Sequence, residues 1–223
     1  MNGMGWTWTT ALLVGFMVVA VQCAVVAEKQ KAMLHPDSAL FGRNTHDGWR
    51  TERDWAIVTD AVRGGSSTAK VVISPRDKTL YFSGNLDTTT LGGAGFASAR
   101  FNFDAPLNLT GVRALLITVA SRDDKTYALN LVDSLPETSP DGRKQSAIEY
   151  KFSFGPESSF SEKNAEIYAP ISGFVPYYRG RRVENAPPLN TSNIVAISIM
   201  IQSYFDQQKG DYSLKLSSID ARK

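Results

Sequence analysis

Cysteine is nearly absent from this chain of 223 residues, because the single cysteine, Cys23, lies in a hydrophobic N-terminal run. The rest of the chain therefore has no intramolecular disulfide, no thiolate metal site and no cysteine nucleophile, and it must be held together by packing. Histidine is scarce as well, since only His35 and His46 occur, both ahead of the first predicted strand. This scarcity argues against a histidine-based triad and a multi-histidine metal site. We predict no metal and no cofactor.

No excess of charge marks the chain, since 24 basic and 22 acidic residues leave a formal charge of +2. Nucleic-acid binders carry a strong positive footprint, so nucleic acid is not an expected partner. The hydrophobic fraction of 43% is typical of a folded globular domain. Carboxylates are scattered without a spacing that would identify an acid–base pair, so no catalytic residue is predicted and the protein is not expected to be an enzyme.

Charge is also missing from residues 1–27, and residues 11–27 are almost wholly apolar. We expect a hydrophobic helix outside the fold, either a cleaved secretory signal peptide or an uncleaved single-span membrane anchor. Small residues at the end of the run favour cleavage, whereas Lys29 and Lys31 would flank an anchor. Both alternatives predict the secretory pathway. The mitochondrion is the alternative location, although the arginines of a mitochondrial presequence are missing before Arg43.

Short apolar stretches with period-two alternation follow a polar lead, residues 28–50, and fill residues 51–223. The predicted strands are 55–59, 70–74, 79–83, 95–103, 112–120, 126–132, 148–154, 194–202 and 212–221. Alternation gives each strand one apolar face, and two sheets packed face to face bury such faces most economically. We therefore predict a single all-β domain over residues 51–223, a jelly-roll β-sandwich.

Long connections interrupt the predicted strands at residues 133–147 and 155–193. Loops of such length in a compact domain are often functional. The second contains an aromatic and basic run, and Tyr and Arg are the residue types that dominate binding hot spots. An alternative is that Phe174 and one tyrosine only plug the end of the sandwich. The candidate partner-binding residues are Arg100, Phe174, Tyr177, Tyr178, Arg179 and Arg181.

The glycines of residues 92–95 resemble part of a dinucleotide fingerprint, but Ser98 stands in place of the third glycine and a strand follows. A loop with close backbone approach or positive φ is the expectation instead. Two N-glycosylation sequons begin at Asn108 and Asn190, each just before a predicted strand. Both asparagines are candidate glycosylation sites, with chance occurrence of so short a pattern as the alternative.

Several stretches, in a fixed order, resemble the family of complex I intermediate-associated protein 30. They are Trp55, residues 60–67, 82–84, 93–100 and 169–171, then Phe174, Pro176, 179–181, 210–214 and Ile219. The resemblance covers residues 55–219, nearly the whole predicted domain. It implies a galactose-binding-like jelly roll and a non-enzymatic role in the assembly of mitochondrial respiratory complex I.

The leading hypothesis is therefore a protein-binding, chaperone-like assembly domain, with complex I assembly intermediates as the partner that the resemblance implies. A secretory-pathway glycan-binding, lectin-like module is the alternative, because the leader, the sequons and the implied fold all fit it. If the leader is not cleaved, residues 11–27 would attach the domain to a membrane through a single span.

Overall fold

The structure, a computed structural model, describes residues 38–136, 145–156 and 165–223. The predicted leader, with its hydrophobic helix, and parts of both long connections lie outside the described residues. Within the described residues, no helix is long and apolar enough to cross a membrane. The helical turns in these ranges are the 3-10 helices η1 (Glu52–Asp54), η2 (Asp60–Arg63) and η4 (Ile171–Gly173). The described part is otherwise built from strands and loops, which confirms the all-β prediction.

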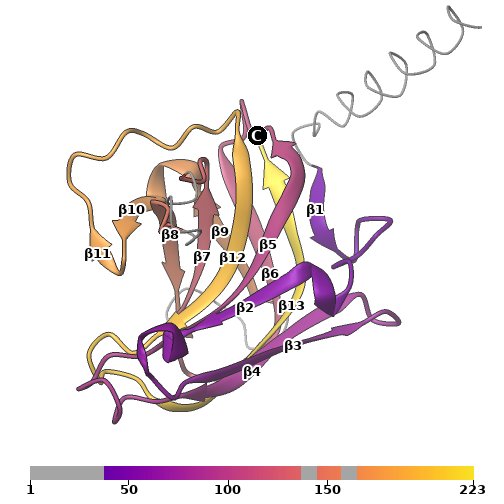
Figure 1. Cartoon of the computed structure of the whole chain (residues 1–223). Helices are drawn as coiled ribbons and strands as arrows, with labels where there is room; N and C mark the ends of the chain where they lie inside the picture. Colours follow the sequence, from indigo (N-terminus) through magenta and orange to yellow (C-terminus); the bar gives the residue numbers. More distant parts are fainter. Residues whose placement is uncertain (1–37, 137–144, 157–164) are drawn as a thin grey trace, which may run out of the picture. The chain divides into compact units, whose positions relative to one another are not determined.

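Two antiparallel sheets form the fold (Figure 1). The six-stranded sheet has the order β3-β4-β13-β6-β9, with β1 also paired to β13, and the seven-stranded sheet has the order β11-β10-β8-β7-β12-β5-β2. The six-stranded sheet contains β1 (Ala39–Gly42), β3 (Thr68–Ser74), β4 (Thr79–Leu86), β6 (Ala114–Arg122), β9 (Ala165–Pro170) and β13 (Gly210–Arg222). The seven-stranded sheet contains β2 (Trp55–Thr59), β5 (Phe96–Leu107), β7 (Tyr127–Val132), β8 (Glu149–Phe154), β10 (Val175–Tyr178), β11 (Arg181–Arg182) and β12 (Ile194–Gln202).

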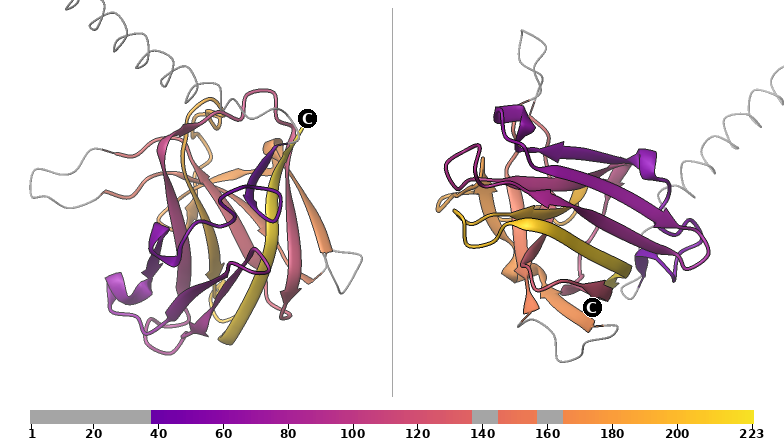
Figure 2. Two further views of the ribbon diagram at one scale, coloured as in Figure 1. Left: turned by 90° about the vertical axis from the view of Figure 1, so that its right-hand side faces the viewer. Right: turned by 90° about the horizontal axis from the view of Figure 1, so that it is seen from below.

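The core lies between the sheets and follows the alternation in the sequence. In β12, Ile197, Ile199 and Ile201 are each no more than 1% exposed. The long β13 pairs with β4 and β1 along one side and with β6 along the other, and both views in Figure 2 show it as the yellow strand. β2 and β12 have the bounds predicted for residues 55–59 and 194–202. The structure thus confirms a two-sheet antiparallel sandwich.

Residues 39–50 belong to the sandwich, which corrects their assignment to a polar lead. β1 adds to the six-stranded sheet beside β13. Trp49 is 1% exposed, and its ring stacks on that of Phe41 with centroids 5.6 Å apart. The Trp49 Nε1 donates to the backbone oxygen of Lys78 over 3.0 Å, and the Trp55 Nε1 donates to that of Trp49 over 3.0 Å. The polar composition of the intervening residues hid these aromatic anchors from sequence reasoning.

The connection predicted as a loop over residues 155–193 contains β9, β10 and β11. In β9, the inward positions are Ala165, Ile167 and Ala169, all buried, so only one large apolar side chain marks the alternation. Arg179 and Gly180 join β10 to β11 with φ values of 50° and 80°. Two left-handed residues are typical of a type I′ hairpin turn. Because β10 pairs with β8, this hairpin extends the seven-stranded sheet.

Asp60 is a buried carboxylate that ties together segments at one end of the sandwich. Its Oδ1 accepts a hydrogen bond from the Ser67 amide over 3.0 Å. Its Oδ2 accepts bonds from the Ser67 hydroxyl over 2.5 Å and from the Phe96 amide over 3.2 Å. A Cβ at Gly65 would lie 2.3 Å from the Asp60 Oδ1, so a glycine is required there. This part of the family pattern therefore serves packing.

The glycines of residues 92–95 serve backbone geometry, as the sequence predicted. Gly92 and Gly93 have positive φ values of 60° and 90°, a region that glycine adopts without steric cost. A Cβ at Gly95 would lie 2.2 Å from the backbone oxygen of Asp87, so the chain just after β4 and the chain just before β5 approach closely there.

Candidate functional site

The seven-stranded sheet carries polar side chains on its outer face, which is the face directed away from the core. Residues that alternate with the inward apolar side chains of a strand point to this outer face. Strand register places Arg100 opposite Ser198, and Ser198 opposite Asn130. Asn130 in turn lies opposite Lys151. These residues, called the polar row below, cross β5, β12, β7 and β8 in succession.

Asn130 occupies the middle of the polar row and is fully buried, with 0% of the residue exposed. Its Nδ2 donates to the Glu149 Oε2 over 3.0 Å and to the Ser198 Oγ over 3.2 Å. The same nitrogen lies 3.4 Å from the Sδ of Met200. The Asn130 Oδ1 is buried and has no hydrogen-bond partner among the residues that the structure describes. Buried side-chain acceptors are normally satisfied, so this open acceptor distinguishes the polar row from an ordinary sheet surface.

Arg100 uses few of its donors. The Nε donates to the Asn102 Oδ1 over 3.1 Å, and the Nη1 lies 3.9 Å from the Glu149 Oε1. The Nη2 is buried, and no described residue forms a hydrogen bond with it. A guanidinium group offers five N–H donors in a planar fork, so Arg100 retains capacity for a further acceptor.

Lys151 ends the polar row under an aromatic ring. The residue is only 4% exposed, and its Nζ donates to the Gln202 Oε1 over 2.7 Å. The Nζ also lies 4.5 Å from the ring centroid of Tyr177, within the range of a cation–π interaction. Tyr177 lies opposite Glu149 across the β8–β10 pair, so its ring belongs to the same face.

Burial shifts the pKa of every charged group at the polar row toward its neutral form. It raises the pKa of the Glu149 carboxyl, although Arg100 and Lys151 act in the opposite direction. Burial lowers the pKa of Lys151 and of Arg100, and Glu149 only partly offsets this effect. Charged groups that are held at the expense of stability cluster at functional sites. The polar row is therefore our candidate functional site.

The family model described as complex I intermediate-associated protein 30 matches residues 43–216, a range that includes the polar row and most of both sheets. The chain belongs to the complex I intermediate-associated protein 30 family. It is also similar to an uncharacterized protein of Schizosaccharomyces pombe, with 39% identity over 186 residues that cover 82% of each chain. The resemblance found in the sequence motifs is thereby confirmed.

Among solved structures, this member of the complex I intermediate-associated protein 30 family is similar to carbohydrate-binding modules of Clostridium thermocellum. The family 11 module of the cellulosomal cellulase Lic26A-Cel5E matches with a TM-score of 0.54 and 12% identity over 83% of this chain and 94% of the module. A family 11 module in complex with a β-1,3-1,4-mixed-linked tetrasaccharide matches with a TM-score of 0.50 and 14% identity, over 76% and 88%. At such identities the likeness concerns the fold.

Two of the residues predicted to bind a partner, Arg100 and Tyr177, are brought together on the outer face. Glu149 connects them, because it lies opposite Tyr177 in the sheet and 3.9 Å from the Arg100 guanidinium. The sequence separates these residues by a large part of the domain, so only the strand order makes them neighbours. This pair lies on the outer face of a sheet, whereas the sequence had pointed to a loop.

The other hairpin residues point away from the polar row. Tyr178 follows Tyr177 in β10, so its side chain lies on the opposite face of that strand, where it is 39% exposed. The Arg179 guanidinium lies 5.4 Å from the Tyr178 ring centroid, and the Arg179 Nε donates to the Ser146 Oγ over 3.3 Å. Arg181 lies opposite Tyr178 and is exposed. These hairpin residues form a second, separate group.

Phe174 is not an exposed recognition residue. It is 6% exposed, and its ring packs on that of Phe152 with centroids 5.7 Å apart. The structure corrects the prediction that Phe174 is available to a partner. Phe174 instead fills the edge of the sandwich, which is the alternative given by the sequence.

The two sequon asparagines lie between strands, as expected. Asn108 follows β5 and is half-buried, and its Oδ1 accepts a hydrogen bond from the Thr110 amide over 2.9 Å. Asn190 is exposed, and its Oδ1 accepts a bond from the Ser192 hydroxyl over 2.7 Å. Glycosylation at either position stays a prediction.

Sequence reasoning missed Asn130, Glu149, Lys151 and Ser198 as members of the site. Each alternates with apolar side chains in a predicted strand, which was a signal for an outer face. Their convergence depends on the order β5-β12-β7-β8, and sequence neighbours do not reveal that order. Lys151, between Tyr150 and Phe152, was the strongest hint, because a charge in a buried strand needs a partner.

Proposed function

We propose that this family domain is a non-enzymatic protein-binding module, a chaperone-like assembly factor, and that the polar row together with Tyr177 holds its partner. Family membership supports an assembly intermediate of respiratory complex I as that partner. We further propose a jelly-roll connectivity of the galactose-binding type for the sandwich.

One observation carries the proposal: buried polar and charged groups gather on the outer face, where they do not help to fill the core. Lys151 is 4% exposed and Asn130 is 0% exposed, yet within the described part of the chain the Oδ1 of Asn130 and the Nη2 of Arg100 lack hydrogen-bond partners. A buried charge or open polar atom destabilises a fold, and apolar residues would make this face more stable. A partner that donates to Asn130 and accepts from Arg100 would offset that destabilisation.

Met200 beside Asn130 and Tyr177 over Lys151 are the side chains that a partner would displace at the polar row. Met200 lies beside the Asn130 amide and is half-buried, and a methionine side chain readjusts at low cost. Tyr177 lies near the sheet edge, on a short strand whose other neighbour is the two-residue β11. A partner can therefore displace these two covers without disturbing the core between the sheets.

The chemistry of the polar row supports binding rather than catalysis. Glu149 is its neighbouring carboxylate, and this group is already engaged by the Asn130 amide and the Arg100 guanidinium. Glycoside hydrolysis needs two carboxylates that flank the scissile bond, one to donate a proton and one to attack or activate water. Donors and acceptors aimed outward, next to an aromatic ring, are typical of binding hot spots.

Capture of the native partner tests the proposal, and two neighbouring tyrosines, Tyr177 and Tyr178, serve as test position and control. The full chain carries an affinity tag in its source cells, either unchanged or as Tyr177→Ala or Tyr178→Ala. Because Tyr177 covers Lys151 and Tyr178 points to the opposite face, Tyr177→Ala should reduce recovery of the partner by about tenfold or more, and Tyr178→Ala should leave it nearly unchanged. Equal recovery in both variants would refute the assignment of the binding face.

The location of the protein in the cell distinguishes between the candidate partners. We propose that residues 11–27 direct the chain to the secretory pathway, as a signal peptide or a single-span anchor, and that Asn108 and Asn190 are glycosylated there. A shift in mobility on deglycosylation of the native protein would support this location. Co-migration with respiratory assembly intermediates of the inner mitochondrial membrane would instead support the complex I role.

A glycan-binding, lectin-like function in the secretory pathway is the second candidate. Tyr177 favours it, because a half-buried aromatic ring beside amide and charged hydrogen-bonding groups suits a sugar ring as well as a protein. The fold likeness to carbohydrate-binding modules adds support. A glycan array probed with the full chain tests this function, and signals at background level for all glycans would argue against it.

A further inference from the structure

The loop between β12 and β13 contains an unusual run of backbone conformations. Tyr204, Phe205 and Asp206 have φ values of 48°, 56° and 69°, and none of them is glycine. A left-handed conformation is unfavourable for an L-residue with a Cβ, and non-glycine residues adopt it as single residues rather than in runs. Such strain persists only where the surroundings enforce it, and it clusters at functional segments.

Hydrogen bonds from neighbouring segments enforce this turn. The Asp206 carboxylate accepts bonds from the Thr88 hydroxyl over 2.8 Å and from the Lys209 Nζ over 3.1 Å. The Asp206 amide donates to the Gly93 backbone oxygen over 3.0 Å. Together these bonds fix the residue that follows Phe205.

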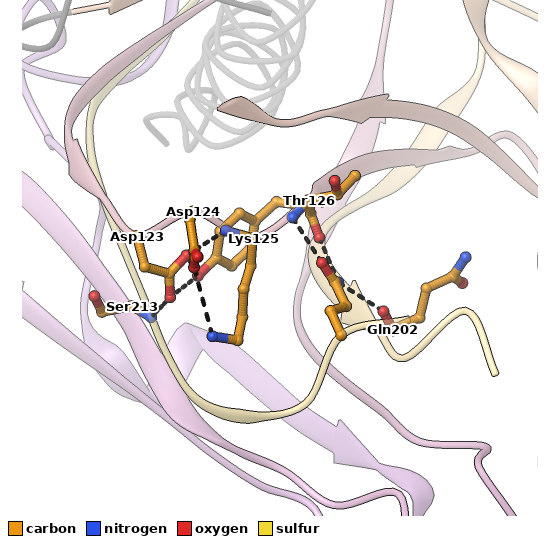
Figure 3. Close-up of polar contacts among 8 residues, drawn as sticks. Asp123, Asp124, Lys125, Thr126, Gln202 and Ser213 are labelled. Carbon is orange, nitrogen blue, oxygen red and sulfur yellow. Dashed lines mark hydrogen bonds and ion pairs between the residues drawn. The ribbon is translucent and has the colours of Figure 1, made fainter. Parts of the chain in front are cut away.

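Gln208 fastens the far side of the loop to the β6–β7 turn. Its Nε2 donates to the backbone oxygens of Thr126 over 2.9 Å and Gln202 over 2.7 Å, and its Oε1 accepts from the Thr126 amide over 2.8 Å. Figure 3 labels Thr126 and Gln202, two partners of Gln208, beside Asp123, whose Oδ2 accepts from the Ser213 amide over 2.7 Å and so anchors the same turn. The loop is therefore held rigidly at both ends.

The rigid turn presents Phe205 to solvent. Phe205 is 83% exposed, the largest value among the exposed large hydrophobic side chains of the described residues. Val62 in η2 is 71% exposed at the same end of the sandwich, because β2 and β12 both flank β5 and end where β5 begins. Figure 1 shows the loops that follow these strands together at the lower end. The exposed Phe205 ring adds no stability to the fold, although the backbone around it is strained.

Tyr204 links this turn to the polar row. Its hydroxyl lies 3.4 Å from the Ser153 Oγ, on the outer face of β8, two residues along the strand from Lys151. A partner bound across the polar row would therefore meet the turn at the end of the same sheet. We infer that Phe205 is an anchor that inserts into an apolar pocket of the protein partner, an inference that rests on the proposed function.

The charges around Phe205 favour a protein pocket over a lipid surface. Hydrogen bonds from Thr89 and Thr90 hold the pKa of Asp87 to about 2, and the bonds to Asp206 lower its pKa as well. Both carboxylates are therefore ionised at neutral pH, and Lys209 pairs with one of them. Attraction to anionic lipid requires an excess of positive charge, which the described residues around Phe205 do not provide.

Phe205→Asn tests the anchor, because asparagine tolerates the left-handed conformation and removes the ring. Capture of the partner by the tagged full chain should fall by about tenfold or more, while the thermal midpoint should stay unchanged or rise. Val72→Thr is the matched control, since Val72 is 48% exposed on β3 in the other sheet, and it should retain the partner.

The outcomes separate this inference from the proposed function. If Tyr177→Ala loses the partner and Phe205→Asn retains it, the polar row stands and the anchor is refuted. If both variants retain the partner, both are refuted. If only Phe205→Asn loses it, the anchor stands and the polar row is refuted.

Sedimentation of the full chain with phosphatidylcholine–phosphatidylserine vesicles distinguishes a protein pocket from a lipid surface. It should be the same for wild type and Phe205→Asn. A loss of sedimentation confined to the variant would overturn the protein pocket in favour of a lipid surface.

Discussion

Replacement of Lys151 by methionine should make the protein more stable, although Lys151 belongs to the proposed site. Methionine has nearly the length of the lysine stem, so packing at this 4% exposed position is kept. The variant loses the hydrogen bond to Gln202, worth about 1.5–3 kcal/mol, and the cation–π contact with Tyr177, worth about 0.5–2 kcal/mol. It also removes the desolvation penalty of a buried ammonium, which is several kcal/mol.

The direction of the expected change in stability follows from the lowered pKa of Lys151. Because burial lowers this pKa, the residue stabilises the fold only above its unfolded pKa, and that stability is lost as the pH falls through the folded pKa. At neutral pH the folded state therefore carries a desolvation cost for the ammonium that methionine would not carry. We expect Lys151→Met to raise the free energy of unfolding by about 1 kcal/mol, or Tm by about 2–4 °C for a domain of this size.

Urea and thermal unfolding of the purified full chain measure the change. Lys70→Met on β3 is the matched control, because Lys70 is exposed and should change stability by less than about 0.5 kcal/mol. If Lys151→Met instead lowered the free energy of unfolding by more than about 1 kcal/mol, the lysine would be a structural residue and the polar row would not be held at the expense of stability.

Further changes test other parts of the structure. Glu149→Gln should stabilise the protein at pH 7, because burial raises the pKa of Glu149 and makes its ionised form unfavourable. The gain in stability should vanish as the pH falls below the pKa of the unfolded state, and unfolding measured between pH 4 and 8 tests this. Asp60→Ala should cost about 3–5 kcal/mol in urea unfolding, because buried donors of Ser67 and Phe96 lose their acceptor, and a cost below about 1 kcal/mol would contradict this. Trp49→Ala should cost about 3–5 kcal/mol, whereas no loss would show that residues 39–50 do not belong to the core.

The fold class could be predicted because the central strands carry a strong alternation. In β12, branched side chains repeat at every second position, and both of its ends were predicted. β1 and β9 escaped, since each has only one or two large inward side chains, such as Phe41 and Ile167. β10 and β11 escaped because a two-residue hairpin at a sheet edge has little burial to impose a pattern.

The site could be predicted only in part, because its residues converge through pairing between distant strands. Residue type singled out Arg100 and Tyr177, and the structure places both beside Glu149. Residue type also singled out Phe174, whose ring fills the sheet edge instead. Asn130 carries no motif, and its role follows from a hydrogen-bond count that only the folded chain reveals.

Site-specific photo-crosslinking tests the binding face most directly. A photoreactive phenylalanine analogue replaces either Tyr177, on the outer face of the seven-stranded sheet, or Val72, exposed on the six-stranded sheet, in the full chain in its source cells. We predict cross-links to one discrete partner from position 177 and none from position 72. Cross-links from position 72 with none from position 177 would contradict the polar row as the binding surface.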